Sequence, residues 1–328
     1  MSAPLLELRG VSVRYPVGWR RRLTAVDRID LVINEGETLG LIGESGSGKS
    51  TVARAIVGLA PVSDGEVLWR GEPTSGFDKS RRREFVEAVQ MVFQDPHSAL
   101  DPRRTILQSV REPLDVMSHG AKSERTEVAL KALSDVGLPD HLVRRYPHQL
   151  SGGQKQRANI ARALVTRPKV LICDESVAAL DVALQAEILN LLQDLKAEYQ
   201  LTIVFISHDL SVVGHIADRM SVMYLGRIVE RATTESMLGR PLHPYSEALL
   251  SAQPLVSGDG ADRRIILTGD IPSPLSPPSG CRFHTRCPHA VERCTAQDPS
   301  LLEVRPDHQS ACLRVEELYG VSAEGSAR

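Results

Sequence analysis

The chain has 328 residues and a formal net charge of −2, with 39 lysines and arginines against 41 aspartates and glutamates. This length suits one large α/β core with a smaller appendage, and the balanced charge excludes a general attraction to nucleic acid or anionic lipid. The chain has neither a basic start followed by an apolar leader nor an apolar run close to about 18 residues. We therefore expect a cytoplasmic protein that meets a membrane only through its partners.

Short apolar runs predict a mainly parallel sheet. Residues 5–15 and 29–33 alternate apolar and polar side chains, as half-buried strands do. Residues 170–173 and 202–206 are nearly continuous apolar runs, typical of parallel strands that are buried on both faces. A helical stripe over residues 182–199 separates the last two runs. This strand–helix–strand order predicts a parallel α/β core.

One stretch within the chain carries no strand signal. Residues 103–148 show helical patterns over 106–114 and 125–136. We expect this stretch to form an inserted helical subdomain.

The most specific motif follows a strand-like run over residues 38–42 and leads into a helical pattern. It reads G-x-x-x-x-G-K-[ST], the P-loop pattern, in its expected strand–loop–helix setting. Glycines let the backbone N–H groups point at phosphate oxygens, and the helix N-terminus adds positive potential. Lys49 would reach the β- and γ-phosphates, and Ser50 would bind Mg²⁺. The predicted nucleotide-binding residues of this motif are Gly43, Glu44, Ser45, Gly46, Ser47, Gly48, Lys49, Ser50 and Thr51.

Two acids end the apolar run at 170–173. Asp174, at the tip of the predicted strand, can hold Mg²⁺ through water, and Glu175 is placed to polarise an attacking water as general base. A solvated strand end would look the same in isolation. The P-loop earlier in the chain favours the catalytic interpretation.

A second anion-binding motif, Leu-Ser-Gly-Gly-Gln at residues 150–154, opens a helix predicted for residues 155–166. A serine hydroxyl and glycine N–H groups at a helix start suit an anion. One γ-phosphate cannot occupy both this motif and the P-loop if they lie far apart, so the natural ligand is the ATP of another chain. The residues concerned are Ser151, Gly152, Gly153 and Gln154.

These motifs, together with Ser207-His208-Asp209, resemble those of ATP-binding cassette (ABC) ATPases in both order and spacing, over about residues 5–235. The resemblance implies a P-loop NTPase (RecA-like) α/β core with an antiparallel β subdomain and an inserted helical subdomain. It also implies that two such ATPases bind ATP and Mg²⁺ between them.

Further residues take their roles from this resemblance. Gln94 resembles the glutamine that senses Mg²⁺ and faces the transmembrane partner, and Ala179-Leu180-Asp181 resembles the segment at the dimer seam. His208 resembles the histidine that contacts the γ-phosphate, and Tyr15 resembles the aromatic residue that stacks on adenine. The implied catalytic residues are then Glu175, His208 and Lys49, and the implied Mg²⁺ ligands are Ser50, Gln94 and Asp174.

The tail has a different character. It contains Pro-Leu-His-Pro-Tyr at 241–245, a proline-rich segment at 271–278 and a Cys-Arg-Phe-His run within 280–289. These elements resemble the tail of the ATPase subunits of oligopeptide and dipeptide importers. The resemblance implies di- or oligopeptide uptake, with nickel or glutathione as alternative cargoes and a soluble, non-transport ABC ATPase as a further alternative. We expect an ATPase domain at 1–238, with its helical subdomain at about 95–160, and a small cysteine-containing domain at 239–328.

Four of the five cysteines lie in this tail, and no pair of them is spaced as C-x-x-C. In a cytosolic chain such a cluster more often holds a metal than a disulfide, and four thiolates can surround one soft metal centre. The resemblance implies a 4Fe–4S cluster, while zinc and free thiols remain open as alternatives. The cysteines are Cys281, Cys287, Cys294 and Cys312.

The resemblance also implies partners. These are a second ABC ATPase subunit, expected to be a related but non-identical chain, and two transmembrane permease subunits with an extracytoplasmic peptide-binding protein. No nucleic acid is expected. The chain would be a peripheral protein on the cytoplasmic side of the cell membrane.

Overall fold

The computed structural model describes residues 4–19, 21–95, 99–118, 120–178, 180–252 and 265–321. The chain divides into two compact units. The helical unit comprises Ile33–Glu37 and Thr74–Ile206, and the P-loop unit comprises Pro4–Val32, Thr38–Pro73 and Ser207–Arg328.

The helical unit contains a short parallel sheet. Its strands lie in the order β8-β7-β6, and β7 runs parallel to both neighbours, with Val170 opposite Val89 and Thr202. Every residue of β7 and β8 is buried. The continuous apolar runs of the sequence are thus confirmed as parallel strands covered on both faces. The strands are β6 (Val89–Val92), β7 (Val170–Asp174) and β8 (Thr202–Ser207).

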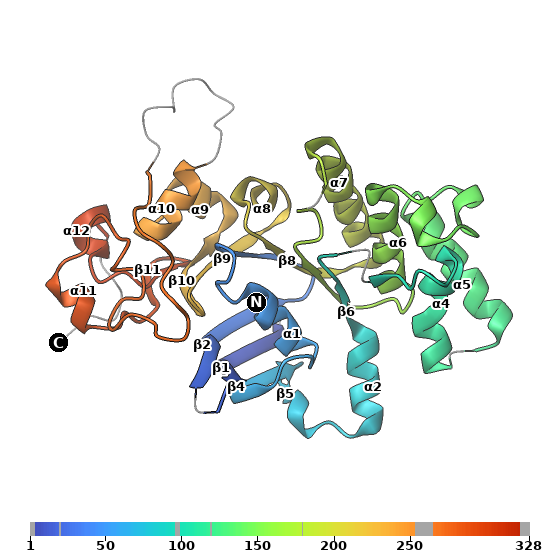
Figure 1. Cartoon of the computed structure of the whole chain (residues 1–328), viewed down its shortest axis with the longest axis horizontal. Helices are drawn as coiled ribbons and strands as arrows, with labels where there is room; N and C mark the ends of the chain where they lie inside the picture. Colours follow the sequence, from blue (N-terminus) through green and yellow to red (C-terminus); the bar gives the residue numbers. More distant parts are fainter. Residues whose placement is uncertain are drawn as a thin grey trace. The chain divides into compact units, whose positions relative to one another are not determined.

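Three helices of the same unit, α4, α5 and α6, pack on one another (Figure 1). The helices predicted at 106–114 and 125–136 are confirmed as α4 and α5, although each begins or ends a few residues away from its predicted bounds. A capping box between Thr105 and Gln108 fixes the start of α4. The helices of this unit are α2 (Lys79–Ala88), α4 (Ile106–Met117), α5 (Lys122–Asp135), α6 (Gly152–Leu164) and α7 (Val182–Tyr199), with short 3-10 turns at Thr74–Gly76, Asp140–Leu142 and Pro147–Gln149.

The P-loop unit holds an antiparallel sheet in the order β2-β1-β4-β5. This sheet confirms the expected antiparallel β subdomain. Its strands are β1 (Pro4–Val17), β2 (Arg21–Asn34), β4 (Val62–Trp69) and β5 (Glu72–Pro73).

The same unit holds a second run of strands, β11-β12-β10-β9-β3. Strand β3 is parallel to β9, and the remaining pairs are antiparallel. The strands are β3 (Thr38–Ile42), β9 (Arg219–Tyr224), β10 (Arg227–Thr233), β11 (Leu302–Arg305) and β12 (His308–Ser310), and the helices of the unit are α1 (Lys49–Ile56), α8 (Leu210–Ile216), α9 (Thr234–Gly239), α10 (Pro244–Ser251), α11 (Glu292–Ala296) and α12 (Val315–Tyr319).

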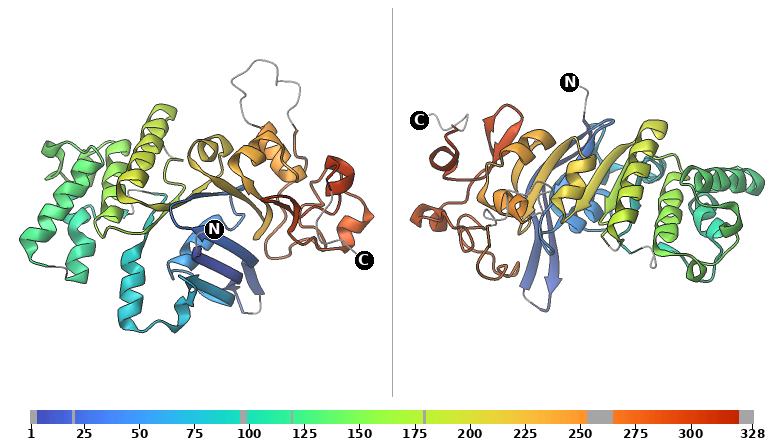
Figure 2. Two further views of the ribbon diagram at one scale, coloured as in Figure 1. Left: turned by 180° about the vertical axis from the view of Figure 1, so that it is seen from behind. Right: turned by 90° about the horizontal axis from the view of Figure 1, so that it is seen from above.

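The tail is continuous with this sheet, because β12 pairs with β10 (Figure 2). A buried polar chain crosses the junction. His308 and Glu230 are both 0% exposed, and His308 Nε2 lies 2.7 Å from Glu230 Oε1. The other ring nitrogen of His308 lies 2.8 Å from Ser236 Oγ. These contacts join β12 to β10 in the protein interior, so they favour this one pairing of the two strands.

Candidate nucleotide site

The P-loop connects β3 to α1 and needs its glycines. Gly43 and Gly48 have φ of 156° and 107°, which L side chains rarely adopt. A Cβ at Gly43 would lie 2.2 Å from the carbonyl oxygen of Met223, and one at Gly48 would lie 2.3 Å from that of Ala25. The backbone of the loop therefore packs against its neighbours so closely that these two positions exclude a side chain.

Two polar side chains of the loop, Ser47 and Lys49, are buried. Lys49 is 3% exposed, and its Nζ donates to the carbonyl oxygens of Gly43 and Glu44 at 2.7 and 3.0 Å. The hydroxyl of Ser47 is buried, with no hydrogen-bond partner among the described residues. A lysine held across a glycine loop at a helix start fits nucleotide phosphates.

In the helical unit, Asp174 is the last residue of β7 and Glu175 follows it, and the two acids differ in their surroundings. Asp174 is 2% exposed. Glu175 has a left-handed backbone, with φ of 46°, and its N–H donates to Ile206 O at 3.0 Å. Its Oε2 accepts a hydrogen bond of 2.8 Å from Gln94 Nε2. The structure thus brings together the predicted base and the predicted Mg²⁺-sensing glutamine.

The second motif forms an open helix start. Ser151 and Gln154 make a capping box, in which Ser151 Oγ accepts from Gln154 N at 3.3 Å and Gln154 Oε1 accepts from Ser151 N at 3.0 Å. Ser151 and Gly152 are exposed and Gly153 is buried. A Cβ at Gly153 would lie 3.2 Å from the side chain of Leu184. The helix start is therefore preorganised, and its first two residues are accessible to another molecule.

The remaining predicted residues lie at element boundaries. His208 follows β8 and is exposed, and Tyr15 is half-buried in β1. Asp181 caps α7 by accepting from Leu184 N at 3.0 Å. Ala179 of the expected seam segment lies outside the described residues.

The predicted site residues fall in both units. The P-loop unit carries Tyr15, residues 43–51 and His208, whereas the helical unit carries Gln94, residues 151–154, Asp174, Glu175 and Asp181.

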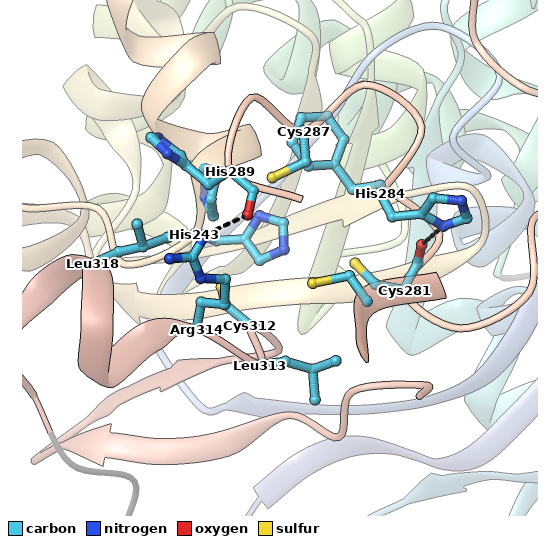
Figure 3. Close-up of a pocket in the computed structure, with 12 residues that line it drawn as sticks. His243, Cys281, His284, Cys287, His289, Cys312, Leu313, Arg314 and Leu318 are labelled. Atoms are coloured by element: carbon cyan, nitrogen blue, oxygen red, sulfur yellow. Dashed lines mark hydrogen bonds between the residues drawn. The ribbon is translucent and has the colours of Figure 1, made fainter. Parts of the chain in front are cut away.

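The metal centre expected in the tail is a wrong prediction. Among the described residues, no group of three or more His, Cys, Asp or Glu side chains is arranged to hold a metal ion. This corrects both the 4Fe–4S cluster and its zinc alternative. Four of the residues that line a pocket in Figure 3 are the free thiols Cys281, Cys287, Cys294 and Cys312.

The thiols of this pocket are protonated. Burial raises the pKa of Cys281 to about 11 and that of Cys312 to about 12, so both keep their protons at neutral pH. The loop is held by direct hydrogen bonds. His284 Nδ1 lies 2.8 Å from Cys281 O, and Arg314 Nη1 donates to His289 O at 2.7 Å (Figure 3).

Sequence reasoning also missed a set of contacts between the tail and the P-loop. Arg286 binds the carboxylate of Glu44, and the hydroxyl of Tyr245 accepts from the Glu44 N–H. The partners are separated by 242 and 201 positions, so no local pattern reports them.

The P-loop between β3 and α1, with an antiparallel β sheet and an added set of helices, defines a P-loop ATPase of the cassette type. Two family models match the chain: "ABC transporter" at residues 26–178, and "Oligopeptide/dipeptide transporter, C-terminal region" at residues 229–294.

Relatives match along almost the whole chain. The oligopeptide transport ATP-binding protein OppF of Salmonella typhimurium is 46% identical over 325 residues, covering 96% of this chain and 97% of its own. The oligopeptide transport ATP-binding protein AppF of Bacillus subtilis is 44% identical over 317 residues, covering 94% and 96%. A solved dimeric ATP-binding cassette in a post-hydrolysis state with ADP and Pi is 32% identical, with a TM-score of 0.63, covering 70% of this chain and 98% of its own. The chain belongs to the ATP-binding proteins of ABC transporters, and it is an ATPase of that family.

No helix within the described ranges is long and apolar enough to cross a membrane.

Proposed function

We propose that this chain is the ATP-hydrolysing subunit of an ABC importer that takes up di- or oligopeptides across the cytoplasmic membrane. The observation that carries this proposal is the extent of the match. The oligopeptide transport proteins OppF and AppF align with both the cassette and the tail, and the tail has its own family model. These names favour neither nickel or glutathione as cargo nor a soluble, non-transport ATPase.

The proposed assembly contains a second ATPase subunit, related but not identical, with two permeases and an extracytoplasmic peptide-binding protein. The exposed start of α6 supports it, because Ser151 and Gly152 are accessible to another molecule. A neighbouring solved cassette is described as a dimer. The chain would then be peripheral, attached to the cytoplasmic side of the membrane through the permeases.

Within this assembly we propose that the P-loop binds the phosphates of ATP, with Lys49 at the β- and γ-phosphates and Tyr15 against adenine. Mg²⁺ would be held by Ser50, Gln94 and Asp174 and would neutralise phosphate charge. The Ser151–Gln154 segment would meet the ATP bound by the partner ATPase, and Asp181 would lie at the seam.

For hydrolysis we propose Glu175 as general base and His208 as the contact to the γ-phosphate. The hydrogen bond from Gln94 to Glu175 supports a link between the permease-facing loop and the base. A general base needs a carboxylate oxygen that can accept the proton of the attacking water. Gln94 occupies one such oxygen of Glu175, so movement of Gln94 would control the base.

We propose that the chain consists of two functional domains with a boundary after residue 238. The ATPase domain would comprise 1–238, with its helical subdomain at about 95–160 coupling to the permeases, and the extension would comprise 239–328.

The test is reconstitution of this chain with its co-purifying ATPase, permeases and binding protein in vesicles. We expect ATP-dependent uptake of labelled oligopeptides, lost with Lys49→Ala. ATP-dependent uptake of another solute without any peptide uptake would overturn the peptide assignment. An active ATPase that binds no membrane partner in the native host would overturn the transport function itself.

A further inference from the structure

The tail contacts the P-loop through a partly buried ion pair. Arg286 Nη1 donates to Glu44 Oε2 at 2.7 Å, and Nη2 donates to Glu44 Oε1 at 3.0 Å. The side chain of Arg286 is 7% exposed and that of Glu44 is 26% exposed. Two parallel hydrogen bonds fix both the position and the orientation of a carboxylate. Arg286 therefore holds the second residue of the P-loop in place.

The backbone of the same residue is held from the tail as well. The N–H of Glu44 donates to the hydroxyl of Tyr245 at 2.9 Å. Tyr245 is 0% exposed, and its ring packs against those of Tyr224 and Phe283 at centroid distances of 4.8 and 5.3 Å. Because aromatic packing fixes the ring, the hydroxyl oxygen is a rigid acceptor. It fixes the plane of the Glu44 peptide.

A second connection reaches the other end of the loop. The carbonyl oxygen of Ser47 accepts from Gly226 N at 2.8 Å. The turn that contains Gly226 is bound by Arg282, which donates to Leu225 O and to the carboxylate of Asp27. Arg282 and Arg286 lie in one short tail segment, 281–287. This segment therefore supports the P-loop at both Glu44 and Ser47.

We propose that Arg286 and Tyr245 are positioning residues for ATP binding, through which the tail sets the shape and charge of the P-loop. The proposal rests on the nucleotide site proposed above. The phosphates of ATP are anionic, and a carboxylate without a partner in the same loop would repel them. Arg286 cancels that charge, while Tyr245 holds the peptide from which the following N–H groups turn toward the phosphates.

This arrangement makes the coupling reciprocal. If the tail segment 281–287 favours ATP binding, then ATP binding must stabilise the tail segment by the same free energy. Amide hydrogen exchange in 281–287 should therefore slow when ATP binds.

The experiment measures the Kd for ATP of the full chain without hydrolysis, at low temperature in the absence of Mg²⁺, together with the thermal midpoint without nucleotide. We expect Arg286→Met to weaken ATP binding by about tenfold or more, the loss of a charge-assisted pair. Arg286→Lys should recover part of the loss. Glu44→Gln in the Arg286→Met background should recover most of it, because the unpaired charge is gone. The matched control is Arg293→Met, which breaks an exposed tail ion pair with Glu317 and should leave ATP affinity unchanged.

The outcomes separate this inference from the proposed site. If Arg286→Met binds ATP as the wild type does, or if Glu44→Gln gives no recovery, the positioning role is wrong. If Arg286→Met fails to fold, the test uses Tyr245→Phe and the amide hydrogen exchange of residues 281–287. The proposal would be overturned if Tyr245→Phe leaves the Kd for ATP unchanged and ATP binding leaves the exchange unchanged. Lys49→Ala serves as the reference: ATP binding that survives this change would instead refute the P-loop site itself.

Discussion

The side-chain amide of Gln94 donates a 2.8 Å hydrogen bond to the carboxylate of Glu175. The donor follows β6 and the acceptor follows β7, and these two strands are adjacent and parallel. Glu175 is further fixed by its left-handed backbone and its N–H bond to Ile206. The proposed base is therefore oriented by contacts within the chain, and the orientation depends on the loop proposed to face the permease.

Replacing Glu175 by Gln should abolish ATP turnover while ATP binding remains. An amide of the same shape can still accept the hydrogen bond from Gln94, but it cannot take a proton from water. Loss of a general base lowers the rate by about 10²- to 10⁴-fold. Steady-state ATPase rates and ATP Kd would be measured side by side. Glu187→Gln is the control, because Glu187 lies exposed on α7 and pairs with Arg157. Comparable hydrolysis in both variants would show that Glu175 is not the general base.

Gly48→Ala should destroy the P-loop. The added Cβ would meet the carbonyl oxygen of Ala25 at 2.3 Å, and the backbone has φ of 107°. The matched control is Gly10→Ala, which has φ of 58° but nothing within 4 Å of the added Cβ, so that it bears only the left-handed strain of about 1–2 kcal/mol. Thermal midpoints and ATP binding should separate the two variants. Equal effects would mean that crowding around Gly48 is unimportant.

His243 should make the tail sensitive to acid. Burial lowers the pKa of His243 from 6.5 to about 3, and its Nδ1 accepts from Tyr245 N at 3.1 Å. Between these pH values the unfolded chain binds a proton that the folded chain does not. The free energy of unfolding therefore has its full value above pH 6.5. It decreases by about 1.4 kcal/mol for each pH unit as the pH falls from 6.5 toward 3.

The substitution that isolates this effect is His243→Asn, because asparagine can still cap α10 without titrating. Urea unfolding of wild type and variant would be compared at pH 7, 6 and 5. We expect the stability difference to shift in favour of the variant as the pH falls. A difference that does not depend on pH would contradict the buried, neutral state of His243.

His308→Ala should loosen the tail from the sheet. It removes one of the two hydrogen-bond partners of Glu230 Oε1, the other being Leu242 N, and Glu230 is fully buried. Leaving a buried polar group short of a partner costs about 1–3 kcal/mol. Limited proteolysis should then release fragments ending near β11 and β12. The exposed His289 provides the control, and His289→Ala should be cleaved as slowly as the wild type. Equal resistance in both variants would show that the junction is held by other contacts.

The sequence was sufficient to predict those features whose residues are consecutive in the chain. The P-loop, the strand ending in Asp174 and Glu175, and the capped start of α6 are each written within ten residues or fewer, and local periodicity predicted α7 at its observed bounds, Val182–Tyr199. The role of each residue in the chemistry remains a prediction.

Sequence reasoning failed where the deciding partner is distant. The spacing of the tail cysteines does not determine where their sulfur atoms point. The ring of Phe283 in the same segment packs against Tyr224 and Tyr245, which are distant in the sequence. Likewise, nothing near Glu44 indicates Arg286. Such contacts are set by strand pairings between distant segments, as between β10 and β12.

The parallel pairing of β3 with β9 also sets the order of events during synthesis. Leu39 lies opposite Arg219, so the strand that leads into the P-loop emerges from the ribosome 180 residues before its neighbour. At 5–20 residues per second, that delay is about 10–40 s. Until β9 has been made, the edge of the apolar strand β3 that pairs with it stays unpaired. Long-range parallel pairing is also slow in itself. The nascent chain is therefore most exposed to aggregation while the helical unit is being made.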